Sequence, residues 1–172
     1  MARPLGVKRP ASIVLADASP LIALGIVGGL AWTHALFGKV TLTAAVHGEV
    51  VPGSDRPGAR EIAAALRRGW LKVIQEQWAE PVFAELDEGE ASTLRAAVNL
   101  RRPCLILMDE KAGRAIAREL GFAVTGTAGI ILAAKRRRLI PAARPVFEQL
   151  LENDFRLSAE LIRAVLDEAG EK

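Results

Sequence analysis

The chain has 172 residues, which is a usual length for one domain and is enough for a single sizeable core. Hydrophobic residues make up 51% of it and charged residues 25%, which excludes disorder of the whole chain. The net charge of +3 is too small to indicate nucleic-acid binding by itself. We therefore expect residues 1–172 to form one domain, with residues 1–11 as a flexible N-terminal segment.

The first predicted elements are a strand and a helix joined by a short turn. Residues 13–16 form an apolar, β-branched run that is typical of a strand buried on both faces. A helix follows, because Ser19 is a good N-cap, Pro20 is a favoured first helical residue, and the apolar pattern breaks around residues 28–29. Further strands are predicted at 40–43, 71–74, 104–108 and 122–125, and further helices at 44–50, 60–68, 88–100, 112–120, 130–138, 142–152 and 158–169.

The alternation of strands and helices indicates an α/β fold with a parallel sheet. Parallel strands need crossover connections, and helices in these connections cover both faces of the sheet. In open sheets of this kind, ligands bind outside the carboxyl ends of the strands. The functional residues are therefore expected at that edge.

Four acidic residues are predicted to converge at the carboxyl edge of the sheet. Asp17 and Asp109 each follow an apolar strand, Glu49 lies in the helix after the second strand, and Glu90 lies in the first turn of the helix at 88–100. Like charges raise each other's pKa and repel, so such a group needs a cation. Mg²⁺ or Mn²⁺ suits the group, because such ions take oxygen ligands and keep several waters.

Each of these residues also has a structural interpretation, which the sequence leaves open. Asp17 fits a turn, and Asp109 fits a cap of the helix that follows it. Asp87 and Glu90 have the spacing of a capping box, in which the glutamate reaches back to the N-cap amide. Glu49 taken alone fits a solvated helix position. Only the joint arrangement of the four acids favours one site.

A basic run in the C-terminal half has two interpretations as well. Lys135, Arg136, Arg137 and Arg138 offer consecutive cations for contact with RNA phosphates. Such a run also fits a solvated helix end, where cations interact favourably with the C-terminal dipole. We favour the helix-end interpretation.

Cysteine content and hydropathy indicate the cellular compartment of the protein. The only cysteine, Cys104, excludes an intramolecular disulfide and a zinc site built on several thiolates, and it suits a reducing environment. We expect a cytoplasmic protein. No uninterrupted apolar segment approaches the ~20 residues that span a bilayer, and Asp17 and Pro20 interrupt the apolar N-terminal region, so no membrane association is expected.

Several segments together resemble the PIN-domain family. In residues 15–22, LADASPLI, a predicted strand ends in Asp-x-Ser ahead of an apolar helix, as at the opening of a PIN domain. Residues 46–50 resemble the second acidic motif of the family. The other matches are to a PIN-like branch related to the VapC toxins, and they lie in residues 89–91 with 96–97, 105–110 and 124–127. The resemblance covers roughly residues 13–165 and rests on the order of the motifs.

This resemblance implies a three-layer α/β/α sandwich whose central parallel sheet has about five strands in the order 3-2-1-4-5. It also implies a metal-dependent endoribonuclease that uses Mg²⁺ or Mn²⁺. Asp17, Glu49, Glu90 and Asp109 map onto the catalytic positions, and Asp17, Glu90 and Asp109 would bind the metal. Ser19 would support Asp17 by hydrogen bonding. Glu90 stands where many members of the family carry Asp.

The functional hypothesis that follows is an RNA-cleaving toxin that a cognate antitoxin restrains and that forms a homodimer. The runner-up is a PIN-like module with weak or no catalysis that binds RNA or a partner protein. Metal titration separates the two, because an enzyme is expected to bind Mn²⁺ through Asp17 and Asp109. A phosphorylated receiver domain fits less well, since Ala18 stands where such a domain needs a second acid.

Overall fold

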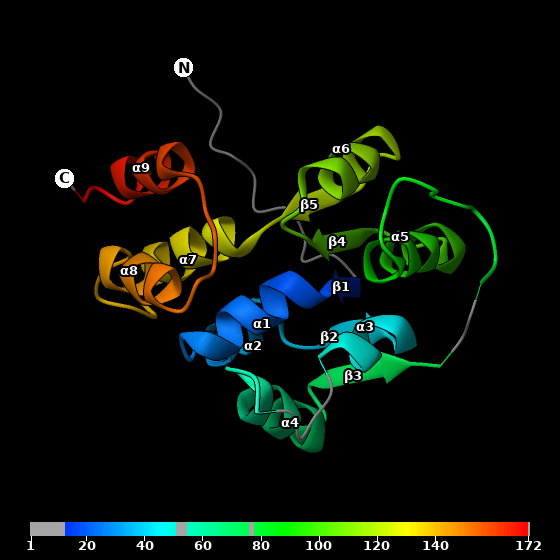
Figure 1. The fold of residues 1–172 in the computed structure, drawn as a ribbon, viewed down its shortest axis with the longest axis horizontal. Coiled ribbons are helices and arrows are strands. Elements are labelled where there is room, and N and C mark those ends of the chain that lie inside the picture. Colours follow the sequence, from blue (N-terminus) through cyan, green and yellow to red (C-terminus); the bar gives the residue numbers. More distant parts are fainter. Residues whose placement is uncertain (1–12, 51–54, 76–77, 172) are drawn as a thin grey trace.

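The structure of the protein, a computed structural model, describes residues 13–50, 55–75 and 78–171. The flexible segment predicted for residues 1–11 lies outside the described residues. A parallel sheet with the strand order β3-β2-β1-β4-β5 forms the centre (Figure 1), which confirms the predicted sheet and its order. The strands are β1 (Ile13–Ala16), β2 (Val40–Thr43), β3 (Leu71–Ile74), β4 (Cys104–Leu107) and β5 (Ala123–Thr125).

The helices of the described residues follow the strands along the chain, mostly within one or two positions of their predicted bounds. They are α1 (Ala18–Ile26), α2 (Leu30–Phe37), α3 (Ala44–Glu49), α4 (Ala59–Arg68), α5 (Glu88–Leu100), α6 (Lys111–Glu119), α7 (Thr127–Arg136), α8 (Arg144–Glu152) and α9 (Ala159–Glu168).

Helices cover both faces of the sheet because successive side chains of each strand point to opposite faces. In β1, Val14 and Ala16 pack with α1 and α4 on one face, whereas Leu15 packs with α5 and α6 on the other. In β4, Leu107 belongs to the first face and Ile106 to the second. The result is the predicted three-layer α/β/α sandwich (Figure 1).

The last three helices form a further apolar cluster beside the sandwich. Phe147 and Leu150 of α8 are buried there with Val165 of α9, and Ala23 links the cluster to α1. Figure 1 shows α7, α8 and α9 gathered at one end of the molecule. The described C-terminal part of the chain is thus packed against α1.

Helix α2 was not predicted, and α1 and α7 begin earlier than predicted. Asp17 rather than Ser19 is the N-cap of α1, so Ser19 lies inside that helix. Gly29 precedes α2 and supplies no side-chain cap, so the local signal of a helix start is absent. Helix α7 begins at Thr127 rather than at residue 130, because the carboxylate of Asp109 accepts hydrogen bonds from Thr127. That cap comes from a residue distant in sequence, which no local pattern shows.

Within the described ranges, no single helix is long and apolar enough to cross a membrane. Helices α1 and α2 reach the necessary length and apolar composition only when taken together, and the chain bends by 120° at the break between them.

Candidate functional site

Asp17 lies at the carboxyl end of β1, where it is the N-cap residue of α1. Its backbone N–H donates to the carbonyl of Leu107, at the end of the neighbouring strand β4, over 2.9 Å. Asp17 is only 3% exposed, and its Oδ1 has no hydrogen-bond partner among the described residues. A buried carboxylate oxygen without a partner costs free energy, so this position favours a bound proton or cation.

Helices α3 and α5 bring Glu49 next to Asp17. Glu49 is the last residue of α3, and Gly89, in the first turn of α5, lies against both carboxylates. A Cβ atom on Gly89 would collide with Oε1 of Glu49 and would lie 3.1 Å from Oδ1 of Asp17. The missing side chain of Gly89 therefore leaves the space that the two carboxylates occupy.

Glu90 divides its two carboxylate oxygens between the helix and the site. Its Oε2 accepts the backbone N–H of Asp87 at 3.3 Å, and Oδ1 of Asp87 accepts the backbone N–H of Glu90 at 2.9 Å, so the predicted capping box is present. The other oxygen, Oε1, is buried, and no group in the described chain bonds to it. The capping role of Glu90 thus uses one oxygen and leaves the other available for a ligand.

Asp87 is a further acidic residue of the site, to which sequence reasoning assigned only a capping role. Its charge raises the pKa of Asp17, Glu49 and Glu90. We call Asp17, Glu49, Asp87 and Glu90 the acidic cluster. The signal that could have found Asp87 is its position as the N-cap of α5, directly before the turn that carries Glu90.

Burial and the repulsion of neighbouring charges raise the pKa values of Asp17, Glu49 and Glu90. Burial is the largest cause for Asp17, whose pKa rises from 3.8 to about 7, and the charges of the other three residues of the acidic cluster add to it. Burial followed by the charge of Asp87 also raises the pKa of Glu49 and of Glu90. A divalent cation offsets both effects, because a nearby opposite charge favours the ionised carboxylate.

Asp109 lies two residues beyond β4 and caps α7. Its Oδ1 accepts the backbone N–H of Thr127, and its Oδ2 accepts the hydroxyl of Thr127, both at 2.7 Å. Burial raises the pKa of Asp109, whereas the hydrogen bonds from Thr127 and the nearby Arg114 lower it. Asp109 is therefore a helix cap, but of α7 rather than of α6, the helix directly after it.

The structure brings Asp17, Glu49 and Glu90 together and places Asp109 at the neighbouring strand end. The charge of Glu110 raises the pKa of both Glu90 and Asp109, so the two acids share a charged neighbour. In the described part of the chain, no three His, Cys, Asp or Glu side chains form a ready-made metal cage. An incomplete cage fits Mg²⁺, which usually takes one or two carboxylates and completes its shell with water and substrate phosphates.

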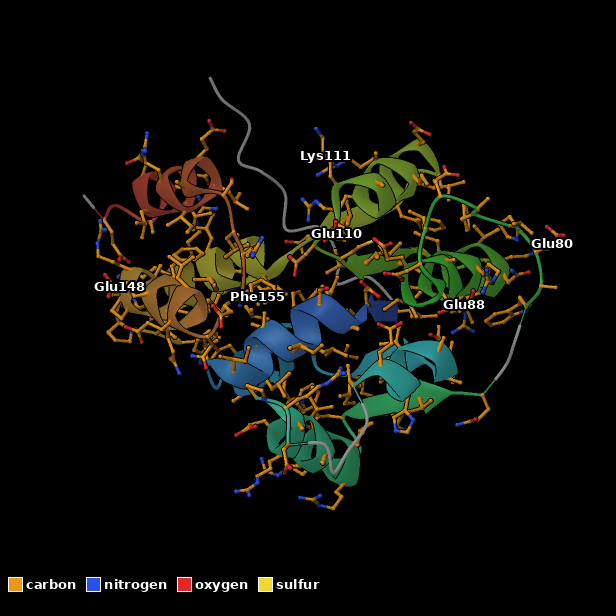
Figure 2. All side chains as sticks on the ribbon, viewed as in Figure 1. Glu80, Glu88, Glu110, Lys111, Glu148 and Phe155 are labelled. Carbon is orange, nitrogen blue, oxygen red and sulfur yellow. The ribbon has the colours of Figure 1, made fainter. Side chains whose placement is uncertain are left out.

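A cleft of about 820 Å³ opens beside Asp109, and we call it the Asp109 cleft. Glu110 and Lys111 lie on its α6 side, and Phe155 lies on the side of the C-terminal helices (Figure 2). Ser19 also lines the cleft. Its hydroxyl does not bond to Oδ1 of Asp17, because that oxygen has no partner in the described structure. The basic side chains of the cleft are Lys111, Arg114 and Arg156.

The predicted basic run, residues 135–138, lies at the C-terminal end of α7. Asp109 is bonded to the first residue of this helix, and ten helical residues span about 15 Å, so the run is remote from Asp109. The Lys135 ammonium donates to the Pro141 carbonyl at 2.6 Å, and Arg136 pairs with Glu168 at 2.8 Å. These contacts agree with the helix-end interpretation.

A parallel sheet in this strand order, with carboxylates gathered at its carboxyl edge, defines an α/β domain with an acidic site. The DUF3368 family model, described as a PIN domain, matches residues 13–171. The chain therefore belongs to the PIN-domain family, as its sequence motifs predicted. PIN domains are generally nucleases, and they typically use divalent metals. No curated protein and no solved structure matches the chain.

Proposed function

We propose that this protein is a Mg²⁺- or Mn²⁺-dependent endoribonuclease that hydrolyses phosphodiester bonds of RNA. The observation that carries the proposal is the pair of buried oxygens, Oδ1 of Asp17 and Oε1 of Glu90, which no group of the described chain satisfies. A divalent cation bound there supplies positive charge for a phosphate oxygen and lowers the pKa of water.

The acidic residues divide into ligands and an orienting group. Asp17 and Glu90 hold the cation through the two buried oxygens, and Asp109 is the third proposed ligand. Asp109 keeps its hydrogen bonds to Thr127 in this role, because each carboxylate oxygen has a second lone pair. Glu49 is more exposed than Asp17 and Glu90 and lies beside Asp17 across Gly89, so it orients the attacking water and accepts its proton.

The proposed RNA substrate approaches along the Asp109 cleft. Lys111, Arg114 and Arg156 place cations on its walls, beside the acidic side chains of Asp109, Glu110 and Glu168. Cations in a cleft attract a phosphate backbone, and the strength of this attraction depends on salt. RNA binding should therefore weaken steeply as the salt concentration rises.

The toxin role extends this proposal. It rests on the motifs shared with the VapC-related branch, and it includes a cognate antitoxin protein and a homodimeric state. Co-purification of a bound inhibitory protein from the native cells and a mass measurement by light scattering test these two partners separately. A monomer that co-purifies with no inhibitory protein contradicts the toxin role and leaves the nuclease proposal in place.

A PIN-like module without catalysis is the second candidate. The observations that favour it are the incomplete metal cage among the described residues and the two hydrogen bonds that occupy Asp109. Such a module would bind RNA or a partner protein without cleaving it. Cleavage assays and metal titration distinguish the two candidates.

The decisive experiment compares cleavage of single-stranded RNA in Mn²⁺ by the wild type, Asp17→Asn and Glu90→Gln. Gln can still complete the capping box, but it is a poorer metal ligand than a carboxylate, so Glu90→Gln should keep its fold and lose cleavage. Glu85→Gln, which neutralises an exposed acid outside the cluster, is the matched control and should cleave like the wild type. Equal cleavage rates for all four proteins would refute the acidic-site mechanism, and no cleavage by the wild type would favour the second candidate.

A further inference from the structure

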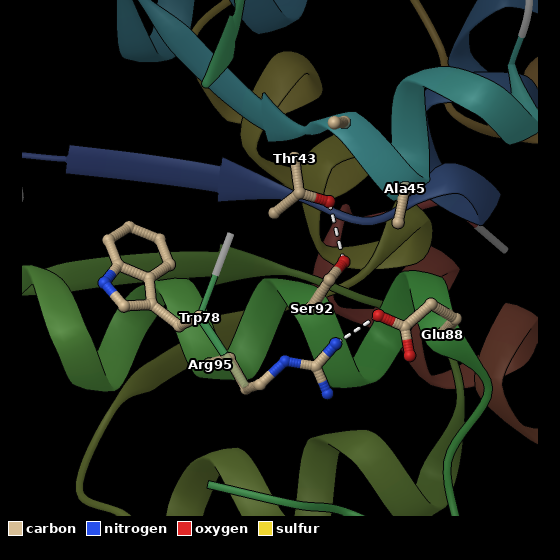
Figure 3. Close-up of a pocket in the computed structure, with 7 residues that line it drawn as sticks. Thr43, Ala45, Trp78, Glu88, Ser92 and Arg95 are labelled. Atoms are coloured by element: carbon tan, nitrogen blue, oxygen red, sulfur yellow. Dashed lines mark hydrogen bonds and ion pairs between the residues drawn. The ribbon is translucent and has the colours of Figure 1, made fainter. Parts of the chain in front are cut away.

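A second cavity, of about 380 Å³, lies beside the acidic cluster at the carboxyl end of β2 (Figure 3). We call it the Trp78 pocket, and the side chains that matter in it are Thr43, Trp78, Glu88, Ser92 and Arg95. Its volume lies within the range of about 300–1,000 Å³ that is usual for small-ligand pockets. The proposed metal site uses none of these side chains.

Helix α5 connects the Trp78 pocket to the acidic cluster. Glu88, Ser92 and Arg95 are spaced four and three residues apart, so they share one face of the helix. Gly89 lies on the adjoining face, against Asp17 and Glu49. A ligand in the pocket is therefore separated from the acidic cluster only by the first turns of α5.

Two hydroxyl groups give the pocket hydrogen-bond acceptors. Oγ of Ser92 donates to the carbonyl of Gly89 at 2.9 Å and lies 2.7 Å from Oγ1 of Thr43. Because Ser92 has a single hydroxyl proton, the proton between the two oxygens belongs to Thr43. Oγ1 of Thr43 also accepts the backbone N–H of Val46 at 3.2 Å. Both protons are thus in use, and the hydroxyls offer lone pairs to a ligand.

An aromatic ring and a planar cation complete the pocket. Trp78 and Arg95 both line the pocket, and Figure 3 shows the guanidinium of Arg95 bonded to Glu88. The Arg95 side chain is 12% exposed and that of Glu88 is 68% exposed, so the cation is held inward by an acid at the surface. Arg has five N–H donors in one plane, and it stacks on flat rings.

We propose that the Trp78 pocket binds a nucleobase of the RNA strand, next to the nucleotide whose phosphate lies at the acidic cluster. That the nucleobase belongs to RNA rests on the proposed function. A nucleobase is flat and carries donors and acceptors on its edge, which matches an indole face, the donors of Arg95 and the acceptors of Thr43 and Ser92. The pocket selects unpaired RNA, because a base within a duplex has its faces stacked and its edge paired.

The test measures binding separately from cleavage. In an Asp17→Asn background without divalent metal, fluorescence anisotropy reports the Kd of a labelled single-stranded RNA of about eight nucleotides, with the same sequence as a duplex for comparison. Trp78→Leu keeps an apolar side chain and should weaken single-strand binding about 5- to 100-fold, whereas Trp78→Phe should retain most of it. Trp32→Phe, which alters an indole outside the pocket, is the control and should bind like the parent.

Arg95 and Glu88 provide a second test with opposite signs. Arg95→Gln should weaken binding of the single strand, and Glu88→Gln, which releases Arg95 from its acid, should tighten it. A merely structural role of the pair predicts no tightening. An unchanged Kd for Trp78→Leu, or equal affinity for single strand and duplex, would overturn the proposal.

The outcome also separates this proposal from the proposed function. If the wild type cleaves no RNA in Mn²⁺ but binding still depends on Trp78, the nucleobase pocket stands and the nuclease proposal fails. If the wild type cleaves RNA and Trp78→Leu changes neither KM nor Kd, the nucleobase pocket fails alone.

Discussion

The buried carboxyl of Asp17 should make the metal-free protein less stable as the pH rises, and Asp17→Asn should remove this effect. The pKa of Asp17 is 3.8 in the unfolded chain and about 7 in the fold, because burial disfavours the charged form. The folded state therefore binds the proton more tightly. Its stability falls as the pH rises from about 4 to about 7, and this contribution is constant above that range.

The size of the effect follows from the pKa difference. One pKa unit corresponds to about 1.36 kcal/mol, so the difference between 3.8 and about 7 amounts to roughly 4 kcal/mol at pH 8. At pH 5 only part of it remains, about 2 kcal/mol. Because about 1 kcal/mol moves the Tm of a domain of this length by about 2–4 °C, Asp17→Asn should raise the Tm at pH 8 by up to roughly 8–16 °C. Asn also serves as an N-cap, so the start of α1 is kept.

The assay is thermal unfolding followed by circular dichroism in EDTA, at several values between pH 5 and pH 8.5, with Glu85→Gln as the control. Mn²⁺ at about 100 times its Kd should add about 2.7 kcal/mol to the wild type. Asp17→Asn should gain less stability from Mn²⁺, so the difference in Tm between the two proteins should become smaller. A Tm difference that does not change with pH in EDTA, or an Asp17→Asn protein with a lower Tm than the wild type at pH 8, would refute the reasoning.

Three further predictions test the geometry of the site. Thr127→Val removes the hydroxyl donor of Asp109 and should lower the free energy of unfolding by about 1–2 kcal/mol in urea titration; an unchanged midpoint would mean that this bond contributes nothing. Gly89→Ala places a Cβ against Glu49 and Asp17, so it should weaken Mn²⁺ binding in calorimetry, although Ala favours the helix. An unchanged Mn²⁺ affinity would contradict the position of Gly89 against the two carboxylates. The Mn²⁺ affinity of the wild type should rise about tenfold per pH unit below pH 7 and level off above it, because the metal competes with the Asp17 proton; a flat profile would speak against Asp17 as a ligand.

The sheet could be predicted because short stretches of sequence determine where its strands begin and end. Apolar runs such as residues 104–108 contain strands that are buried on both faces, and an acid directly after each run marks the carboxyl edge. Helix α2 could not be predicted, since Gly29 offers no cap and α1 ends only three residues earlier. What marks α2 as a helix is its packing on the core, where Leu30 is buried, and packing is not visible in a local pattern.

The candidate site was predictable in composition but not in its bonding. The spacing of Asp87 and Glu90 gives the capping box, yet it does not show that the second oxygen of Glu90 stays without a partner in the described structure. The bond from Asp109 to Thr127 joins residues 18 positions apart, so it depends on how β4 and α7 meet. Likewise, the charge of Asp87 becomes part of the site only when α5 packs against α3 and β1.

The tethered carboxylate of Glu90 has a consequence for the torsional freedom of a metal ligand. A free glutamate side chain loses up to about 2 kcal/mol of rotamer entropy when it is fixed. The capping box already restrains these torsions in the folded protein, because Oε2 is bonded to the amide of Asp87. A cation arriving at Oε1 therefore meets a pre-oriented oxygen, and little further ordering is required. Tethering gives the longer glutamate side chain the restricted motion that a shorter aspartate has through its fewer rotatable bonds.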